Sequence, residues 1–488
     1  KKSQASAALW RKYLPALLFL ICMLCYLLIF LVGPLVRDIH PRTRGDEPHY
    51  LIMADSILRD GDLILTDDYS SRNYVREGYC VGDRLDPHIT VGRNGRPAPW
   101  HPVMLSLVIL PGFALLGYQG AGITVILFMC LSALLTFLII RNAYGHDLAS
   151  FLITLFFFLT YPAVSYSHLI YPEVAAMLLL TLGFWCCLKA GGGDKYLLVS
   201  GLCAGFLPHF HVKFIVLSAA LAVLATFKAG GRLKGLVSFY APAAALLLAL
   251  AVWSCYLYGN FLRGLTLSSG GKSVGIGAPW GVPGLYLDRS WGLIAFAPLY
   301  LVFFAGLRLP FSKKDLISSW NLAFISIAAY TLVVGSFRQW NGGSSPAPRY
   351  LVPLIPFFLV FAAGFILGAR RLYLKVALAA LALAQAVITL FALAYPTDTF
   401  GMAYTAVVQA QTPCGNRLYQ RMLGAPLARA VQSVFPMFHP VTAGTVALLC
   451  CWILFIAALA YLRRYYLDAG PLSALHECNG AKGFTRPR

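Results

Sequence analysis

Long apolar runs recur along almost the whole length of this chain, and they constrain its fold more than any other feature. A run of about 18 or more apolar residues is long enough to form a helix that crosses a bilayer. Only 12% of the residues are charged, whereas a soluble domain carries about 25%. The sequence therefore predicts an all-α polytopic membrane protein and excludes the water-soluble classes.

The apolar runs and their basic flanks predict about twelve transmembrane helices, within a range of roughly eleven to thirteen. The first run is too long for the core of a signal peptide and lacks a clear cleavage site, so we expect it to be retained as a membrane helix. The predicted spans lie near residues 13–36, 119–141, 148–168, 172–189, 196–210, 212–228, 235–258, 291–308, 316–336, 351–369, 373–395 and 441–462.

The basic residues between the runs predict the orientation of the chain. Arg141, Lys189 and Arg370, for example, lie in alternate short connections. Because such residues gather on the cytoplasmic side of a membrane, we expect both termini to be cytoplasmic. The net charge of +20 then reflects topology together with an anionic substrate or membrane lipids, and no nucleic-acid partner is predicted.

The segments predicted to lie outside are longer than the cytoplasmic ones: 37–118, 259–290, 337–350 and 396–440. The end of the first, 101–117, is apolar but short and is interrupted by Pro111 and Gly112, so it suits an interfacial or re-entrant helix. We expect three regions: a main membrane region (1–395), an external loop (396–440), and a last span with a cytoplasmic tail (441–488).

Carboxylates are concentrated in the first external loop, since 11 of the 19 Asp and Glu residues fall between Asp38 and Asp86. Within it, Asp46 and Glu47 follow Gly45 and precede an apolar stripe, which predicts the start of an amphipathic helix in the membrane interface. Acids in a first helical turn stabilise the helix. Capping and catalysis are therefore both open for this pair.

Three further polar clusters fall at the predicted external ends of spans. Glu173 begins the run "PEVAAMLLL", where an acid is costly in a membrane helix and usually functional, although it could also cap the helix. His209, His211 and Lys213 lie in "PHFHVKF", and the alternative there is an exposed turn. Trp340 and Arg349 lie in "QWNGGSSPAPRY", which could equally be an ordinary basic loop.

All of these clusters share one side of the membrane if the predicted topology holds. They combine carboxylates, which can remove a proton from a hydroxyl, with cations, which can stabilise a phosphate leaving group. Such a combination fits the transfer of a group from a lipid phosphate to an acceptor at the external face.

The layout resembles the GT-C class of membrane glycosyltransferases, in particular the protein O-mannosyltransferases and lipid A aminoarabinose transferases. Asp46-Glu47 matches the acidic pair of their first external loop. The segment "GRPAPWHPVMLSLVILPGFALLG" is similar to the family's loop, in which His-Pro or Pro-Pro precedes a short apolar helix. "YPEVAAMLLL", "LPHFHVKF" and "GGSSPAPRYLVPLIP" look like segments of a group of bacterial members. The acceptor-side signatures of the well-studied families are not evident here.

This resemblance implies a sugar donor on a polyprenyl phosphate, an inverting reaction, and an active site that faces the periplasm from a bacterial inner membrane. The acceptor is a lipid, a glycan or a protein. Asp46 would be the base, and Glu47 would share that role or orient the acceptor. Some members use a divalent metal, for which His209 and His211 are the candidate ligands. The implied substrate-binding residues are Arg44, His49, His101, Glu173, His211, Lys213, Trp340 and Arg349.

Two other functions fit a protein with many spans. A transporter or flippase would place charges near the bilayer centre and often shows inverted repeats, whereas the charges here gather at one face. A ligase that joins lipid-linked glycans would depend on Arg and His in one large external loop. A disulfide between Cys80 and Cys414, both in predicted external loops, is a further option.

Overall fold

The computed structural model describes residues 2–32, 45–79, 85–261, 280–307, 319–343, 345–399, 417–438 and 441–466. Most of these residues are helical, and the sheet that they contain is a single antiparallel pair, β1 (Ile89–Val91) and β2 (Pro97–Pro99). The predicted all-α fold is confirmed. Cys80, Cys414 and Arg44 lie outside the described residues.

Within the described residues, seven helical stretches are long and apolar enough to cross a membrane, and three shorter helices are also apolar. The chain is therefore an integral membrane protein. The predicted number of about twelve spans stays a prediction. The seven stretches are Arg11–Val32, Met104–Tyr144, Val212–Ala229, Leu233–Tyr258, Arg349–Gly368, Leu372–Ala394 and Ala443–Tyr461; the shorter helices are Asp147–Phe158, Pro172–Leu188 and Ser319–Gly335.

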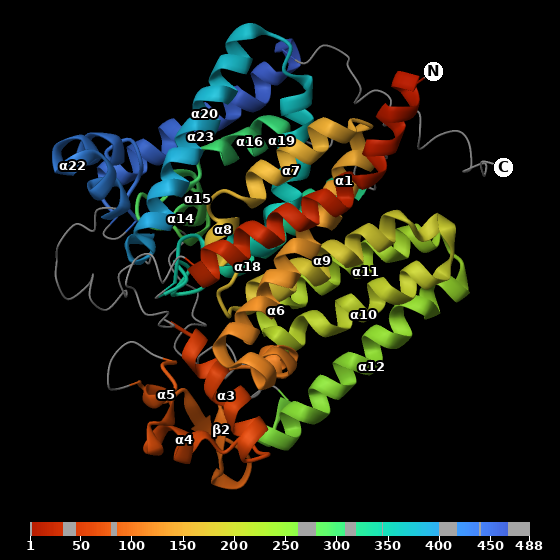
Figure 1. Ribbon diagram of the computed structural model, residues 1–488, viewed down its shortest axis with the longest axis vertical. Helices are drawn as coiled ribbons and strands as arrows, with labels where there is room; N and C mark the ends of the chain where they lie inside the picture. The colour runs from red at the N-terminus through yellow and green to blue at the C-terminus, as the bar shows by residue number, and fades with distance from the viewer. Residues whose placement is uncertain are drawn as a thin grey trace.

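The helices form a bundle with a small lobe at one end (Figure 1). The lobe holds α3 (Glu47–Arg59), α4 (Leu65–Ser71), α5 (Asn73–Arg76) and the β1–β2 pair. The first half of the chain contributes these helices to the bundle: α1 (Lys2–Leu27), α6 (Met104–Tyr144), α7 (Asp147–Phe158), α9 (Pro172–Leu188), α10 (Asp194–Phe210), α11 (Ile215–Ala229) and α12 (Leu233–Tyr258).

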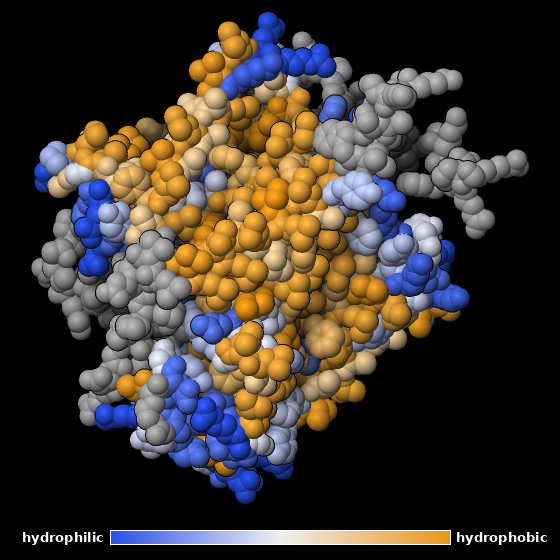
Figure 2. All heavy atoms as spheres, in the orientation of Figure 1, coloured by the Kyte–Doolittle hydropathy of each residue, from blue (hydrophilic) through white to orange (hydrophobic). Residues whose placement is uncertain are grey.

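The rest of the bundle comes from the second half of the chain. Its helices are α14 (Gly281–Leu287), α15 (Leu293–Phe296), α16 (Leu301–Gly306), α18 (Ser319–Gly335), α19 (Ile355–Gly368), α20 (Leu372–Ala394), α22 (Arg417–Gln432) and α23 (Ala443–Tyr466). In Figure 2 a broad apolar surface covers the bundle, and hydrophilic residues gather on the lobe and along the opposite edges. This distribution suits a protein embedded in a bilayer.

Two predicted spans are broken by proline. The predicted helix 148–168 ends at Phe158, before Pro162, and a short helix α8 (Ala163–Tyr166) follows. The predicted helix 291–308 is divided into α15, a 3-10 turn that begins at Pro298, and α16. Both expectations of one continuous helix were wrong, because proline lacks the amide hydrogen that an unbroken helix requires.

Helix α6 contains a sharp corner at Leu116 and Gly117, whose backbone angles are not helical. The corner falls where the sequence predicts that the short apolar helix 101–117 ends and the next span begins. Across it, Gly112 and Gly120 approach so closely that a β-carbon on either would collide with the other's carbonyl group. Glycine is required at both positions because only a bare backbone permits this approach.

Small residues also allow α10 to pack closely against α12. A β-carbon on Gly201 would collide with the backbone of Phe239, and one on Gly205 would meet Ala243 and Leu246. The spacing of the two glycines is the small-xxx-small pattern that brings membrane helices together. This packing places the end of α10, where the predicted histidines lie, against the wall formed by α12.

Asp288 joins two segments that are far apart in the sequence. Its Oδ1 accepts the amide hydrogens of Ser290 (2.8 Å) and Trp291 (3.1 Å), and its Oδ2 accepts that of Phe438 (3.0 Å). The side chain is fully buried. Because three amide groups share one carboxylate, this aspartate holds the segment before α15 to the segment before α23.

We expect Asp288→Asn to destabilise the protein, because an amide group cannot accept hydrogen bonds on both of its ends. The expected cost is about 1–3 kcal/mol, the usual cost of a buried donor left without a partner.

Burial also raises the pKa of Asp288 to about 6 from 3.8. The folded state thus holds this proton more tightly, and the free energy of unfolding falls as the pH rises from about 4 to about 6. Thermal unfolding between pH 4 and 7 should show that this contribution is missing from the variant; an unchanged variant would contradict the assignment.

Candidate functional site

Charged residues from four separate segments meet where the lobe joins the bundle. Asp46 precedes α3, Glu173 lies in the first turn of α9, Lys213 lies in the turn before α11, and Arg349 begins the 3-10 helix η6 (Arg349–Leu354) that leads into α19. Each side chain is thus placed by the start of a helix, and the charges come together although up to about 300 residues of sequence separate them.

The centre of this cluster is the carboxylate of Glu173, whose side chain is 0% exposed. Its Oε1 lies 2.6 Å from Nζ of Lys213 and 2.9 Å from Nε of Arg349. Its Oε2 has no hydrogen-bond partner among the described residues. A buried charge is tolerated only when it is paired, so the two cations and this acid depend on each other.

Arg349 also joins Glu173 to Asp46, because its Nη1 lies 2.6 Å from Oδ2 of Asp46. The guanidinium carbon lies 4.3 Å from the centre of the Tyr171 ring, a distance at which a cation is attracted to the ring face. The backbone of Gly342 approaches the Arg349 side chain, and a β-carbon there would lie 2.9 Å from its Cβ. The backbone of this loop thus comes close to the arginine at Gly342.

Asp46 does not cap α3 through its side chain within the described structure. Its carboxylate points instead to Arg349, and its Oδ1 lies 4.0 Å from Nε2 of His101. Burial acts to raise the pKa of Asp46, but the charges of Arg349, His101 and His88 outweigh it and hold the pKa well below its usual range. The carboxylate is therefore ionised at neutral pH, and it is a weak base while Arg349 holds it.

Glu47 is adjacent to Asp46 in sequence but points in another direction. Its Oε1 accepts the amide hydrogen of Ile170 at 2.9 Å, and the residue is 2% exposed. This bond fastens the start of α3 to the segment before α9. The structure therefore gives Glu47 a contact that positions the backbone, whereas Asp46 faces the cations.

The short sheet brings His88 and His101 together beside Asp46. The pairing of Ile89 with Pro99 extends by one step, since the amide of Trp100 donates to the carbonyl of His88 at 2.9 Å. Nδ1 of His88 and Nε2 of His101 share a hydrogen bond of 2.6 Å. Burial lowers the pKa of His101 to about 4 and also lowers that of His88, so both rings are neutral at pH 7.

His49 extends this group of rings into the lobe. Its ring stacks on that of His88 with centroids 3.5 Å apart, and its Nδ1 shares a hydrogen bond of 2.6 Å with the hydroxyl of Tyr69. His49 is therefore brought to the cluster, as is His101. Sequence reasoning did not find His88 or Tyr69, because neither residue lies in a motif.

The histidines at the end of α10 do not form a metal pair. Nε2 of His209 donates to the carbonyl of Leu246 on α12 at 2.9 Å, whereas Nδ1 of His211 accepts the amide hydrogen of Lys213 at 3.2 Å. In the described parts of the chain, the potential metal ligands that cluster are Asp46, His88 and His101.

Trp340 is buried against α14. Its ring packs against Gly281 and Gly284 of α14, where a β-carbon would collide with it, and its centroid lies 6.2 Å from that of Trp291. The tryptophan thus packs the loop before η6 onto α14, and it is Gly342 that approaches the charged site.

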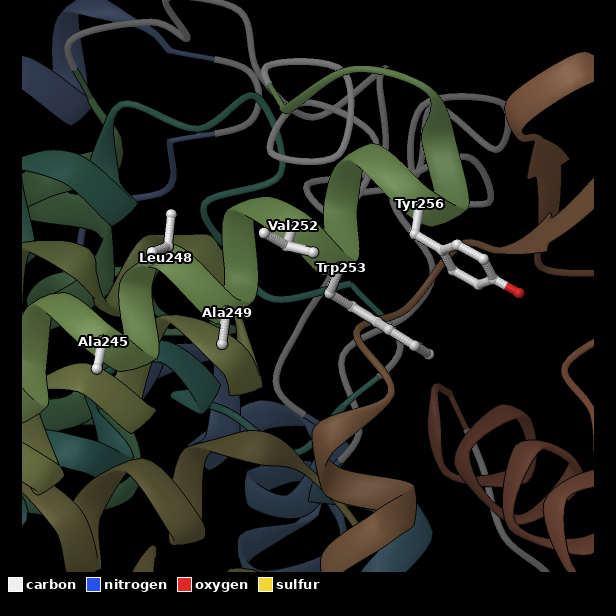
Figure 3. Close-up of a pocket in the computed structure, with 6 residues that line it drawn as sticks. All are labelled: Ala245, Leu248, Ala249, Val252, Trp253 and Tyr256. Atoms are coloured by element: carbon white, nitrogen blue, oxygen red, sulfur yellow. The ribbon is translucent and has the colours of Figure 1, made fainter.

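An apolar groove of about 600 Å³ lies on the outer face of α12 (Figure 3). Its side chains recur at helical spacing and are apolar apart from the indole N–H of Trp253 and the hydroxyl of Tyr256, so the groove has no carboxylate, imidazole or amine group for chemistry. Its lining residues are Ala245, Leu248, Ala249, Val252, Trp253 and Tyr256.

The site lies at the opposite helix ends from the basic residues that predict the cytoplasmic side. Helix α9 begins with Glu173 in its first turn and ends just before Lys189, and α11 begins after Lys213 and has Lys228 in its last turn. By the positive-inside rule the site would face outward, which stays a prediction.

No family model matches the sequence, and no curated protein matches it either. Among solved structures, the chain is similar to ArnT from Cupriavidus metallidurans bound to undecaprenyl phosphate (14% identity, TM-score 0.45, 91% of this chain and 72% of that one). It is also similar to the oligosaccharyltransferase AglB from Archaeoglobus fulgidus in complex with an inhibitory peptide and a dolichol-phosphate (12%, 0.44, 85% and 60%).

These two proteins are GT-C glycosyltransferases, the class that the sequence motifs resemble. The chain spans about three fifths of the length of the archaeal protein. Because the TM-scores are low, a functional proposal has to rest on the residues of the site itself.

Proposed function

We propose that this chain is a membrane glycosyltransferase that moves a sugar from a polyprenyl-phosphate donor to the hydroxyl of a lipid, glycan or protein acceptor. The observation that carries the proposal is the buried bridge in which Arg349 contacts both Asp46 and Glu173, with Lys213 on the same glutamate. Two cations and an ionised carboxylate thus lie next to one another where the lobe joins the bundle.

The cations suit a lipid phosphate. A guanidinium group can bind two phosphate oxygens at once, and an ammonium group supplies a point charge. An arriving phosphate would compete with Asp46 for Arg349, while Glu173 keeps both cations in place from its buried position. Binding of the donor would therefore release Asp46 and raise the pKa of its carboxyl toward the ordinary range.

The released Asp46 would act as the base of a single displacement. The acceptor oxygen attacks the anomeric carbon as its proton passes to Asp46, and the bond between that carbon and the phosphate oxygen breaks. The electron pair leaves with the lipid phosphate, whose charge Arg349 and Lys213 stabilise. One displacement inverts the configuration at the anomeric carbon. On the predicted topology this occurs at the periplasmic face of a bacterial inner membrane.

Turnover and transport can be separated by one experiment. The full chain, reconstituted in nanodiscs, is incubated with a polyprenyl-phosphate sugar, and mass spectrometry follows the lipids while NMR gives the anomeric configuration of the product. Release of free polyprenyl phosphate together with an inverted glycoside supports the proposal. Movement of the intact donor across proteoliposomes without chemical change would instead identify a transporter or flippase.

Arg349→Lys should weaken the binding of polyprenyl phosphate about tenfold or more, a loss of about 1.4 kcal/mol or more. Lysine keeps the charge but cannot contact Glu173 and two phosphate oxygens at once, as a guanidinium group can. Lipid affinity can be measured by titration in nanodiscs. The matched control is Arg338→Lys, which changes an exposed arginine in the same loop and should bind as the wild type does. Equal affinity in the two variants would rule Arg349 out as the phosphate ligand.

A further inference from the structure

A second chemical feature adjoins the ion-pair cluster, on the side of the lobe. One ligand atom each from Asp46, His88 and His101 lie within 4.8 Å of one another. The other charged groups of the site are Lys213, Arg349 and the glutamate that pairs with them, Glu173. Asp46, His88 and His101 therefore provide the atoms that could bind a metal ion. We propose that these three residues bind one divalent transition ion, for which Zn²⁺ is the suitable probe.

The spacing of the three ligand atoms fits such an ion after small movements. Zinc binds imidazole nitrogen and carboxylate oxygen at about 2.0–2.2 Å, so neighbouring ligand atoms lie roughly 3–3.5 Å apart. The two nitrogens of His88 and His101 are 2.6 Å apart, and Oδ1 of Asp46 is 4.0 Å from the nitrogen of His101. These two separations have to change by about 1 Å or less, and the third, between Asp46 and His88, lies within the 4.8 Å that bounds the group.

The neighbours of the three residues hold them as the outer contacts of a metal site usually do. Asp46 gives Oδ2 to Arg349 and turns Oδ1 toward His101. His88 is held by its stack on His49 and by the bond from Trp100 to its carbonyl. Two electron pairs on neutral imidazole rings, only 2.6 Å apart, can be shared by one proton or by one metal ion.

The donor set also selects the kind of ion. Two imidazoles and one carboxylate suit zinc and other first-row transition ions, whereas calcium and magnesium require a shell made mainly of oxygen atoms. The catalytic meaning of the site rests on the proposed function. An ion here would hold the acceptor oxygen beside Asp46 and lower the pKa of its hydroxyl, so that a weak carboxylate base would suffice.

Metal titration of the full chain tests this inference. The protein, with its purification tag removed, is dialysed against a chelator and titrated with Zn²⁺ by calorimetry, and Co²⁺ is added separately to record its visible absorption. The wild type should bind one ion per chain. His88→Ala and His101→Ala should each bind at least tenfold more weakly and lose the Co²⁺ bands.

The matched control is His209→Ala, which removes a histidine whose Nε2 is bonded to the carbonyl of Leu246, and it should bind as the wild type does. His88→Gln, with unchanged thermal unfolding, separates loss of the ligand from loss of the fold. The inference is overturned if the wild type binds no ion. It is also overturned if the His88→Ala and His101→Ala variants bind the ion as tightly as the wild type does. If the protein transfers sugar but binds no ion, the proposed function stands and the metal site is wrong. If it binds an ion but transfers no sugar, the metal site stands and the proposed function is wrong.

Discussion

Asp46→Asn should reduce the rate of sugar transfer by about 10²–10⁴-fold, the contribution that a general base usually makes. The amide is close in shape to the carboxylate but cannot accept the hydroxyl proton at neutral pH. The affinity for polyprenyl phosphate should remain or increase, because the variant no longer competes for Nη1 of Arg349. Single-turnover transfer and lipid titration in nanodiscs measure the two quantities separately.

Glu47→Gln is the matched control for this experiment. Glutamine keeps an oxygen that can accept the amide hydrogen of Ile170, so transfer should stay within a few-fold of the wild type. An Asp46→Asn protein with full turnover would refute the base assignment. If the rate fell equally in the two variants, the acid pair would be acting as a structural unit, and the separate roles assigned to Asp46 and Glu47 would be wrong.

Glu173→Gln should destabilise the protein by about 3–5 kcal/mol, because it leaves Lys213 and Arg349 with an uncompensated buried charge. The exposed fractions of these side chains are 1% for Lys213 and 9% for Arg349, so water cannot replace the lost carboxylate. We expect a large drop in the midpoint of thermal unfolding in detergent and a low yield of folded protein.

Adding Lys213→Met to Glu173→Gln should recover a substantial part of this loss, because the second change removes the unpaired ammonium group. The control is Glu77→Gln, which breaks an ion pair at the surface: Arg59 is 51% exposed and Glu77 is 41% exposed. Exposed pairs contribute about 0.2–1 kcal/mol, so this variant should unfold almost as the wild type does. A Glu173 variant as stable as the Glu77 variant would contradict the buried-pair description.

The sequence predicted the helices well because membrane insertion is a local property. An apolar run of sufficient length has to be helical in lipid, whatever its neighbours are, and most of the predicted runs became helices. The exceptions lie at Pro162 and Pro298. A hydropathy average does not register the single missing amide hydrogen that ends a helix at each of them.

The charged core of the site was also visible in sequence, because Glu173, Lys213 and Arg349 stand at the ends of apolar runs, where charges are costly. The direction of each side chain was not visible. Asp46 and Glu47 are neighbours, yet one faces Arg349 and the other holds the amide of Ile170. Which way a side chain points depends on packing between distant segments, and no local pattern encodes it.

The position of His88 also could not be predicted from local sequence. It lies in a polar loop without a motif, and it meets His101 only because two strands of three residues pair in one register. A shift of one residue would turn the ring to the other face of the pair. The composition of the loop indicated that it is functional. The strand register that brings His88 to His101 could not be predicted from the sequence.

The corner in α6 helps to position Asp46. Ser106 lies in the short arm of that helix, before the corner at Leu116. It donates a hydrogen bond of 2.8 Å to the carbonyl of Tyr50 in α3, so the arm supports the helix that follows Asp46. The arm is in turn braced against the membrane span by the backbone contact of Gly112 with Gly120. A misplacement of about 1 Å can cost 10²-fold in rate. In the proposed reaction, the position of Asp46 therefore depends on Gly112 and Gly120, and a side chain at either glycine would displace the arm.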